Sequence, residues 1–268
     1  HNITPHNYFI NTNNQLYDLL NNGRSDLLKF IKKEPLCIGD SNFNSQELKN
    51  VGFKNVRTIP IAINYRKYNL ILNQQIIKKY KDEYINILFV GRIAPNKKQE
   101  DILKIYNFYK KYINQKCRLF LIGSTNNRPL YGEFLKEIIV KNDLSDVHFC
   151  ENIPLNDLVT YYNLADIFIS MSEHEGFMVP LVESMLFKVP ILAYSSSAIP
   201  YTLGNSGIKI ETKDYAVMAE MINPILKYKK SILEKQNERL KAFSLEKIKQ
   251  EYLNLIEEVV VSTKDTKE

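Results

Sequence analysis

The chain has 268 residues, 44% of them hydrophobic, which is enough for one large or two ordinary domains with a proper core. Its net charge of +6 is compatible with phosphate-bearing ligands or an anionic membrane face, although lysines spread over helices as a solvated surface are the simpler interpretation. No basic patch interleaved with aromatic residues indicates a nucleic-acid partner, and no run resembles a signal peptide or a membrane span.

The three cysteines, Cys37, Cys117 and Cys150, are odd in number and widely spaced, and two of them lie in apolar, strand-like runs. We expect buried free thiols in a reducing compartment. This favours a cytoplasmic protein, with peripheral contact at the cytoplasmic membrane face left open. Since the chain opens at His1 without an initiator methionine, we expect it to be a fragment of a longer protein.

The first quarter of the chain predicts two helices and two short strands. Leucines on a helical period mark the first helix, and Asp40-Ser41 provides a capping break before the second. Residues 64–84 then turn polar and basic, so we place a domain boundary there, with the end of one domain and its linker in 1–66 and a second domain in 67–268. The expected elements are helix 13–33, strand 35–39, helix 44–51 and strand 55–63.

The second part of the chain alternates strands with helices and closes on a long amphipathic helix from Leu245 onward, for which docking onto the second domain is the simplest expectation. Strands this apolar, separated by helices, imply a parallel sheet that is covered on both faces. The expected strands are 85–90, 118–122, 147–150, 166–170, 191–194 and 207–210, and the expected helices are 99–113, 130–141, 155–163, 179–187, 200–203 and 215–228.

The most informative stretch is SEHEGFMVPLVESMLFKVP, residues 172–190, in which Glu175 and Glu183 stand eight positions apart. Glu175 falls in the loop at the carboxyl end of a buried strand, where ligands of open α/β sheets bind. Glu183 falls about two turns into the next helix, whose N-terminus would attract phosphate. A single helical glutamate is usually solvated, but this helix has little polar surface, so its carboxylate faces a cleft or is costly. The pattern favours a nucleotide sugar as ligand.

A second motif, FVGRIAPNKKQ, places Gly91, Arg92 and Lys97 between a strand and a helix. Glycine allows a ligand to approach the backbone closely, and Arg and Lys suit phosphate oxygens. On spacing alone, a basic surface loop that caps a helix is the alternative. His174 could act as a base but is more often a bystander in such a loop, and His148 suits a core or edge position. No metal-ligand spacing of His, Cys or Asp is present, nor an Asp-x-Asp element.

In this order, FVGRIAPNKKQEDIL, RLFLIGS, DVHFCENIP and YYNLADIFISMSEHEGFMVPLVESMLFKVPILAYSSSAIPYTLG resemble the nucleotide-sugar-binding half of a family 4, or group 1, retaining glycosyltransferase. HNITPHNYF, LYDLLNNGRSDL and DSNFNSQELKNVGFKNVRTIPIAIN resemble the end of the N-terminal domain of that family, and YRKY resembles its linker. The resemblance implies an α/β fold of the GT-B type, with a Rossmann-like parallel sheet flanked by helices and a truncated remnant of a second Rossmann-like domain.

The resemblance also implies a role for each matching position. Arg92 and Lys97 would bind the donor diphosphate and stabilise its departure, Glu183 would hold the ribose hydroxyls, and Glu175 would contact the donor sugar near the reacting carbon. His1 resembles a histidine that lines the reaction centre. The backbone at Gly91 and at Gly176, Phe177, Met178 and Val179 would approach sugar and phosphate, and Asn152, Ile153 and Pro154 lie where the base-contacting loop of the family falls. Two positions depart from the family pattern: Lys98 stands where a glycine is usual, and Met178 replaces a small residue.

The implied activity is transfer of a sugar from a UDP- or GDP-linked donor to a glycan, lipid or other acceptor, with retained anomeric configuration and without a metal or cofactor. Acceptor selection would lie mostly in missing N-terminal residues or in another chain, so we expect this chain to bind donor and to transfer slowly or not at all. Alternatives are a non-catalytic donor-binding or partner-activating subunit, and a GT-B-shaped epimerase, which the loop at 172–180 disfavours. The lysine-rich helices expected at 76–81 and 227–235 could contact anionic lipid, although a solvated face is the simpler interpretation.

Overall fold

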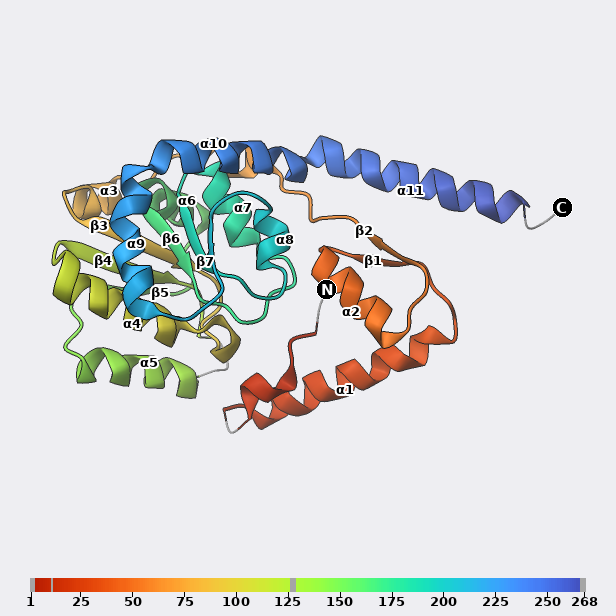
Figure 1. The fold of residues 1–268 in the computed structure, drawn as a ribbon, viewed down its shortest axis with the longest axis horizontal. Coiled ribbons are helices and arrows are strands. Elements are labelled where there is room, and N and C mark those ends of the chain that lie inside the picture. Colours follow the sequence, from red (N-terminus) through yellow and green to blue (C-terminus); the bar gives the residue numbers. More distant parts are fainter. Residues whose placement is uncertain (1–2, 11, 126–128, 266–268) are drawn as a thin grey trace.

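The centre of the fold is a six-stranded, fully parallel sheet in the order β5-β4-β3-β6-β7-β8 (Figure 1). The computed structural model describes residues 3–10, 12–125 and 129–265. Within it the alternation of strands and helices that the sequence predicts is present, which makes the fold α/β. The strands are β3 (Ile85–Val90), β4 (Cys117–Ile122), β5 (Val147–Cys150), β6 (Ile167–Ser170), β7 (Ile191–Tyr194) and β8 (Ile208–Ile210).

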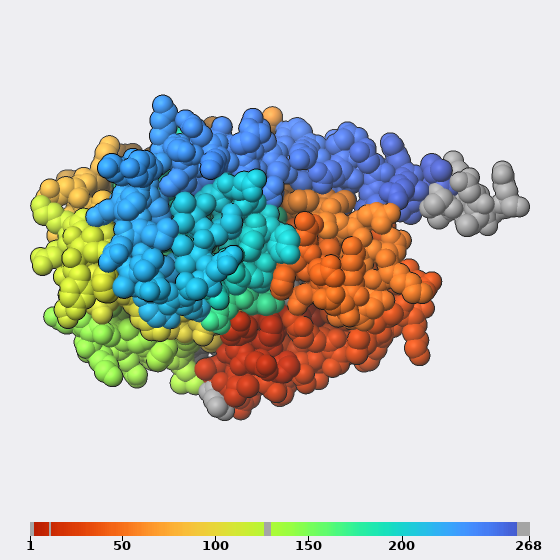
Figure 2. Space-filling view, viewed as in Figure 1, coloured from red at the N-terminus to blue at the C-terminus, as the bar shows by residue number. Residues whose placement is uncertain are grey.

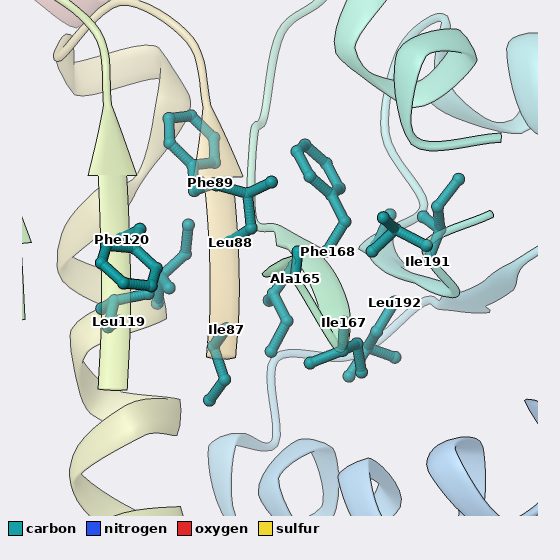
Figure 3. Close-up of a cluster of buried hydrophobic side chains, with 14 of the residues drawn as sticks. Ile87, Leu88, Phe89, Leu119, Phe120, Ala165, Ile167, Phe168, Ile191 and Leu192 are labelled. Carbon is teal, nitrogen blue, oxygen red and sulfur yellow. The ribbon is translucent and has the colours of Figure 1, made fainter. Parts of the chain in front are cut away.

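The central strands are buried on both faces, because their sequences are apolar without alternation. In β3, Ile87, Leu88 and Phe89 are all fully buried, and their neighbours in β4 and β6 are equally enclosed. Figure 3 shows part of this core, where side chains of β3, β4, β6 and β7 meet. Burial of consecutive residues on both faces is typical of a parallel sheet covered by helices, whereas an antiparallel sheet commonly has one solvent-exposed face.

Helices cover the sheet in two layers, as right-handed crossovers between parallel strands require. Helix α4 packs against α5 and α9, whereas α3 packs against α6 and α7 against α10. The helices are α3 (Gln74–Tyr80), α4 (Gln99–Phe108), α5 (Pro129–Lys141), α6 (Leu155–Leu164), α7 (Val179–Leu186), α8 (Ile199–Leu203), α9 (Tyr215–Lys227) and α10 (Lys229–Leu240).

The expected helix 99–113 is not uniform. It is α-helical to Phe108 and then continues as a π-helical turn, η4 (Tyr109–Ile113), closed by a bond from the Asn114 amide to the Tyr109 carbonyl. The buried Tyr109 hydroxyl donates to Asn223 Oδ1 of α9 at 2.7 Å. The widened last turn therefore carries the residue that makes a side-chain hydrogen bond to the neighbouring helix. Single π-helical turns of this kind are the usual form in which π-helix occurs.

A smaller N-terminal lobe contains η1 (His6–Phe9), α1 (Asn14–Ile31), β1 (Cys37–Gly39), α2 (Asn42–Val51) and β2 (Val56–Thr58). The strand expected over 55–63 is shorter than predicted, because Pro60 has no amide to donate to a ladder. Helix α3, within the polar boundary segment, agrees to within two residues with the lysine-rich helix expected over 76–81. The division into domains at residues 66 and 67 stays a prediction.

The last helix, α11 (Leu245–Asp265), lies along the smaller lobe instead of docking on the large sheet (Figure 1). Its Ile248 and Leu255 are buried with Ile59, and Arg57 forms an ion pair with Glu258 at 2.8 Å. Figure 2 shows the blue C-terminal residues across the orange N-terminal ones. The simplest sequence expectation for this helix is therefore wrong, since its apolar stripe faces the first lobe of the chain.

Gly123 sets the spacing between the loops that leave β4 and β3. Its φ is +151°, and a Cβ atom there would lie 1.9 Å from the carbonyl oxygen of Gly91. We expect Gly123→Ala to lower the free energy of unfolding by about 3 kcal/mol or more, because it combines backbone strain with overpacking against backbone atoms. Urea denaturation measures this change.

The matched control is Gly23→Ala in α1, where the nearest neighbour of the new Cβ would be the flexible end of Ile3 at 3.4 Å. Alanine is the better helix former, so this variant should be neutral or more stable by up to about 1 kcal/mol. Equal destabilisation of both variants would contradict the close approach at Gly123.

Candidate functional site at the carboxyl edge of the sheet

A cavity of about 360 Å³ opens beyond the carboxyl ends of β3 and β6. These strands are neighbours, but the chain leaves β3 toward β4 and leaves β6 toward β7, on the opposite side. Such a reversal of strand order creates a crevice at the carboxyl edge, where ligands of open α/β folds bind. The lining residues come from the loop after β3, the loop after β6 and the smaller lobe: Thr4, Asp40, Ile61, Val90, Gly91, Arg92, Asn96, Lys97, His174, Glu175, Gly176, Phe177, Met178, Val179 and Pro180.

The basic residues of the cavity follow β3. Gly91 directly follows the strand, Arg92 is exposed at the cavity, and Lys97 closes the short turn η3 (Pro95–Lys97). Asn96, the buried middle residue of this turn, donates from Nδ2 to the carbonyl oxygen of His174 at 3.1 Å. The sequence motif thus places both cations in one cavity and ties their loop to the loop that follows β6.

Lys97 and Glu175 meet across the cavity. Lys97 Nζ lies 2.5 Å from Glu175 Oε2, and the two side chains are only 12% and 7% exposed. The Glu175 amide donates to Ser197 Oγ at 2.8 Å, which fixes the backbone of the carboxylate. Its second oxygen, Oε1, is buried and has no hydrogen-bond partner among the described residues. A buried carboxylate oxygen normally has a donor, so the site presents an acceptor that suits a ligand hydroxyl.

A residue with left-handed backbone precedes each of the helices that follow the two cavity loops. Lys98 (φ 53°) precedes α4, and Met178 (φ 67°) precedes α7. Glycine adopts this conformation at little cost, which gives a physical reason for the glycine that the family uses at the position of Lys98. Lys98 instead lies within 3.5 Å of Glu100 and 3.6 Å of Glu173. Met178 directs the first turn of α7, including Val179 and Pro180, into the cavity wall.

Glu183 is buried but does not line the cavity. It lies one helical turn beyond Val179 and is 7% exposed. Its two oxygens accept hydrogen bonds from the hydroxyls of Tyr68, at 2.5 Å, and Tyr162, at 2.8 Å. The sequence correctly indicates that this carboxylate is not a solvated surface group, but it gives no sign of either tyrosine.

Other expected positions lie apart from the cavity. Asn152, Ile153 and Pro154 follow β5, which is separated from β3 by β4, and they are not among the lining residues. His1 lies outside the described residues. The structure therefore brings together Gly91, Arg92, Lys97, Glu175 and the segment Gly176, Phe177, Met178 and Val179. Of the other expected residues that it describes, Glu183, Asn152, Ile153 and Pro154 do not line this cavity.

The smaller lobe supplies contacts that the sequence does not reveal. Ser41 Oγ donates to the carbonyl oxygen of Gly176 at 2.6 Å, and Asn44 Nδ2 donates to the same oxygen at 3.2 Å. Asp40 lines the cavity, and burial raises the pKa of its carboxyl, while the Asn44 hydrogen bond acts in the opposite direction. The only signal in the sequence is the capping pattern at Ser41, which predicts a helix start and not a contact to a loop 135 residues away.

Within the described ranges, no group of three or more His, Cys, Asp or Glu side chains is placed to hold a metal ion. In the same part of the chain, no helix combines the length and apolar character needed to cross a bilayer. A hollow of about 710 Å³ lies against α4 and α9, and another of about 460 Å³ lies between α1, β1 and α2. Neither lies at the edge shared by β3 and β6.

The fold and site are those of an open α/β protein with a ligand crevice at its strand-order reversal. The chain belongs to the glycosyl transferases group 1 family, whose sequence model matches residues 72–244. It is 23% identical over 140 residues to the O-antigen chain mannosyltransferase B of Escherichia coli, covering 52% of this chain and 36% of that protein. It is 29% identical over 112 residues to the alpha-monoglucosyldiacylglycerol synthase of Acholeplasma laidlawii, covering 41% and 27%. The chain thus spans less than half the length of these curated relatives.

Solved structures confirm the GT-B type of fold. The Anabaena HepE structure in complex with UDP-glucose matches 88% of this chain and 68% of its own chain, with a TM-score of 0.74 and 14% identity. The structure of a glycosyltransferase from Rickettsia africae matches 88% of this chain and 67% of its own chain, with a TM-score of 0.76 and 21% identity.

His174 gives the site a testable pH dependence. Burial, with the charges of Arg24 and Lys97 nearby, lowers the pKa of its imidazole from 6.5 to about 4. In the unfolded chain the His174 imidazole therefore binds a proton below about pH 6.5, whereas in the folded protein it binds one only below about pH 4. The stabilisation by neutral His174 is complete above the unfolded pKa and is lost as the pH falls. Between pH 7 and pH 5 we expect the free energy of unfolding to fall by about 2 kcal/mol more in the wild type than in His174→Asn.

Chemical denaturation at pH 8, 7, 6 and 5 measures this difference. The pH 8 value is the internal control, because His174 is neutral in both the folded and the unfolded states there. Parallel pH curves for the two proteins would contradict a buried, neutral histidine.

Proposed function

We propose that the protein containing this chain transfers a sugar from a nucleoside-diphosphate sugar to an acceptor hydroxyl, with retained anomeric configuration and without a metal. One observation carries the proposal: Arg92, Lys97 and Glu175 share one cavity at the carboxyl edge of β3 and β6, and Glu175 offers a buried, unpartnered oxygen. Membership of the group 1 glycosyl transferases supports it.

In this proposal the two cations receive the donor diphosphate. Negative charge grows on the leaving diphosphate as the bond to the sugar breaks, and fixed positive charge there lowers the barrier. Arg92 provides a planar fork for phosphate oxygens and Lys97 a point charge. Lys97 already holds its position through Glu175, so little reorganisation is needed when phosphate arrives. The same two charges would do the work that a divalent cation does in other transferases, which is the reason to propose metal independence.

Glu175 and the segment after it would hold the sugar. Glu175 Oε1 can accept a bond from a sugar hydroxyl, while Oε2 keeps its bond to Lys97. The backbone from Gly176 to Val179 lies along the cavity wall and offers amides at the start of α7. Such amides favour negative charge, so the phosphate end of the donor belongs at this helix start. The acceptor would approach from the smaller lobe, past Asp40.

The nucleoside would extend beyond the lining residues. We assign the ribose hydroxyls to Glu183, one turn along α7 from the cavity, and the base to the loop of Asn152, Ile153 and Pro154 after β5. UDP or GDP is the expected nucleotide, and UDP-glucose in the similar HepE structure is consistent with the first. The acceptor is a glycan or a lipid-linked hydroxyl, in line with the names of the mannosyltransferase and glucosyldiacylglycerol synthase relatives. A lipid acceptor would bring the protein to the cytoplasmic membrane face.

Calorimetric titration with UDP, GDP, ADP and their common sugar conjugates tests the donor site. We expect one nucleotide to bind selectively and Arg92→Ala and Glu183→Ala to weaken it at least tenfold, since each removes a charged contact worth about 1.5–3 kcal/mol. Lys116→Ala is the matched control, because Lys116 pairs with Glu83 before the amino end of β4. Loss of affinity in the control to the same degree, or no binding of any nucleotide by the wild type, would refute the proposal.

A donor-binding or partner-activating subunit is a second candidate function, because the same cavity would serve a protein that binds the donor without transferring its sugar. We expect this chain alone to bind nucleotide but to transfer sugar slowly or not at all. The rate of sugar transfer is measured with the chain alone and with the chain supplemented by other proteins from its native source. Robust transfer by the chain alone would exclude the subunit hypothesis, whereas partner-dependent transfer that Arg92→Ala abolishes would support it.

A further inference from the structure

The Glu183 carboxylate is held by two aromatic hydroxyls that come from different parts of the fold. Tyr68 lies on η2 (Tyr65–Tyr68), which precedes the large sheet, and Tyr162 lies in α6. Each hydroxyl donates to a different oxygen of Glu183. Burial, with the Glu183 charge beside them, raises the pKa of both tyrosines, so they remain donors at neutral pH.

The tyrosine rings are themselves held in place. Phe187, at the end of α7, stacks on Tyr162 with ring centroids 5.0 Å apart and an interplanar angle of 13°. It also meets Tyr68 edge to face at 5.7 Å and 88°. The three rings form a rigid surround, here called the aromatic box (Tyr68, Tyr162 and Phe187). Because the rings cannot turn away easily, the direction of the two hydroxyl bonds, and with it the plane of the carboxylate, is fixed.

The two bonds orient the carboxylate without saturating it. An ionised carboxylate has about four lone-pair sites, and the tyrosines use one on each oxygen. Each oxygen can therefore accept one further hydrogen bond. Two remaining acceptor sites on one plane match two adjacent hydroxyls of a ligand, whereas a single hydroxyl or a phosphate does not use both.

A purely structural role explains this arrangement poorly. Glu183 is surrounded on its helix by the buried Leu181, Val182 and Met185. Burying a charge costs several kcal/mol per ion, and well-packed apolar residues of similar volume are commonly as stable or more stable. The buried Glu183 carboxylate therefore lowers the stability of the fold, and binding to a ligand can offset this loss.

We propose that Tyr68 and Tyr162 are positioning residues, which hold Glu183 so that its free lone pairs face a ligand diol, the two ribose hydroxyls of the donor nucleotide. The inference rests on the proposed donor site and adds two residues to it. Neither tyrosine needs to touch the ligand. Their effect is to fix the geometry of the Glu183 carboxylate, so the loss of either hydroxyl costs diol recognition and leaves the binding of diphosphate and base intact.

The test compares nucleotides that do and do not carry the diol. UDP, GDP and ADP and their 2′-deoxy forms are titrated into the wild type, Tyr68→Phe and Tyr162→Phe by calorimetry. We expect the wild type to bind the preferred ribonucleotide at least tenfold more tightly than its 2′-deoxy form. Each tyrosine variant should bind the ribonucleotide about fivefold more weakly and the deoxynucleotide almost unchanged, so that the ratio collapses.

Tyr65→Phe is the matched control, because Tyr65 lies on the same turn but donates to the Leu240 carbonyl at 2.8 Å, away from Glu183. It should keep the wild-type ratio. Thermal unfolding of all variants checks that they are folded, and Glu183→Gln provides a second route to the same collapse of the ratio.

The outcomes separate the two proposals. Equal weakening of both nucleotide forms by Tyr68→Phe, which leaves their affinity ratio unchanged, overturns the positioning role. The donor site stands in that case if Arg92→Ala still weakens binding at least tenfold. Absence of nucleotide binding in the wild type overturns both. Collapse of the ratio in Tyr68→Phe and Tyr162→Phe, but not in Tyr65→Phe, supports the positioning role.

Discussion

The pairing of β3 with β6 is the constraint on which the rest of the structure depends. Ile87 pairs with Ile167, and Leu88 pairs with Phe168. The paired residues are neighbours in the sheet although they lie 80 positions apart in the chain. This pairing places the loop with Arg92 and Lys97 beside the loop with Glu175. Without it, the basic motif and the acidic motif would be two unrelated surface loops. The buried core around these strands is therefore also what holds the cavity in shape.

The loops themselves depend on polar contacts rather than on apolar packing. Asn96 links the two loops, Ser197 holds the amide of Glu175, and Ser41 and Asn44 reach across from the smaller lobe. Each of these side chains bonds to a backbone group that the sheet leaves without a partner. The site is accordingly assembled from several segments, and its geometry is fixed by hydrogen bonds of about 1 kcal/mol each acting together.

Much of the fold could be predicted from the sequence, because apolar runs of four to six residues alternate with amphipathic helices. Three of the six predicted sheet strands have the observed bounds, β3, β5 and β7. The shared position of Arg92, Lys97 and Glu175 also followed, since all three lie just beyond strand ends. The bonds of Glu183 to Tyr68 and of Ser41 to Gly176 could not be predicted, because they join residues 115 and 135 positions apart with no periodicity to reveal them. The placement of α11 was missed for a related reason: an amphipathic stripe shows that a helix is covered on one side, but not by what.

The carbonyl oxygen of Gly176 accepts hydrogen bonds from both Ser41 and Asn44. The peptide unit that carries this oxygen also carries the amide of Phe177, so the direction of that amide in the cavity is tied to α2 of the other lobe. Any hinge motion that separates the lobes must break both of these hydrogen bonds. Separation of the lobes is thus coupled to the cavity wall through this one peptide, whereas Thr202, which donates to the Phe177 carbonyl oxygen, holds the next peptide from within the large lobe.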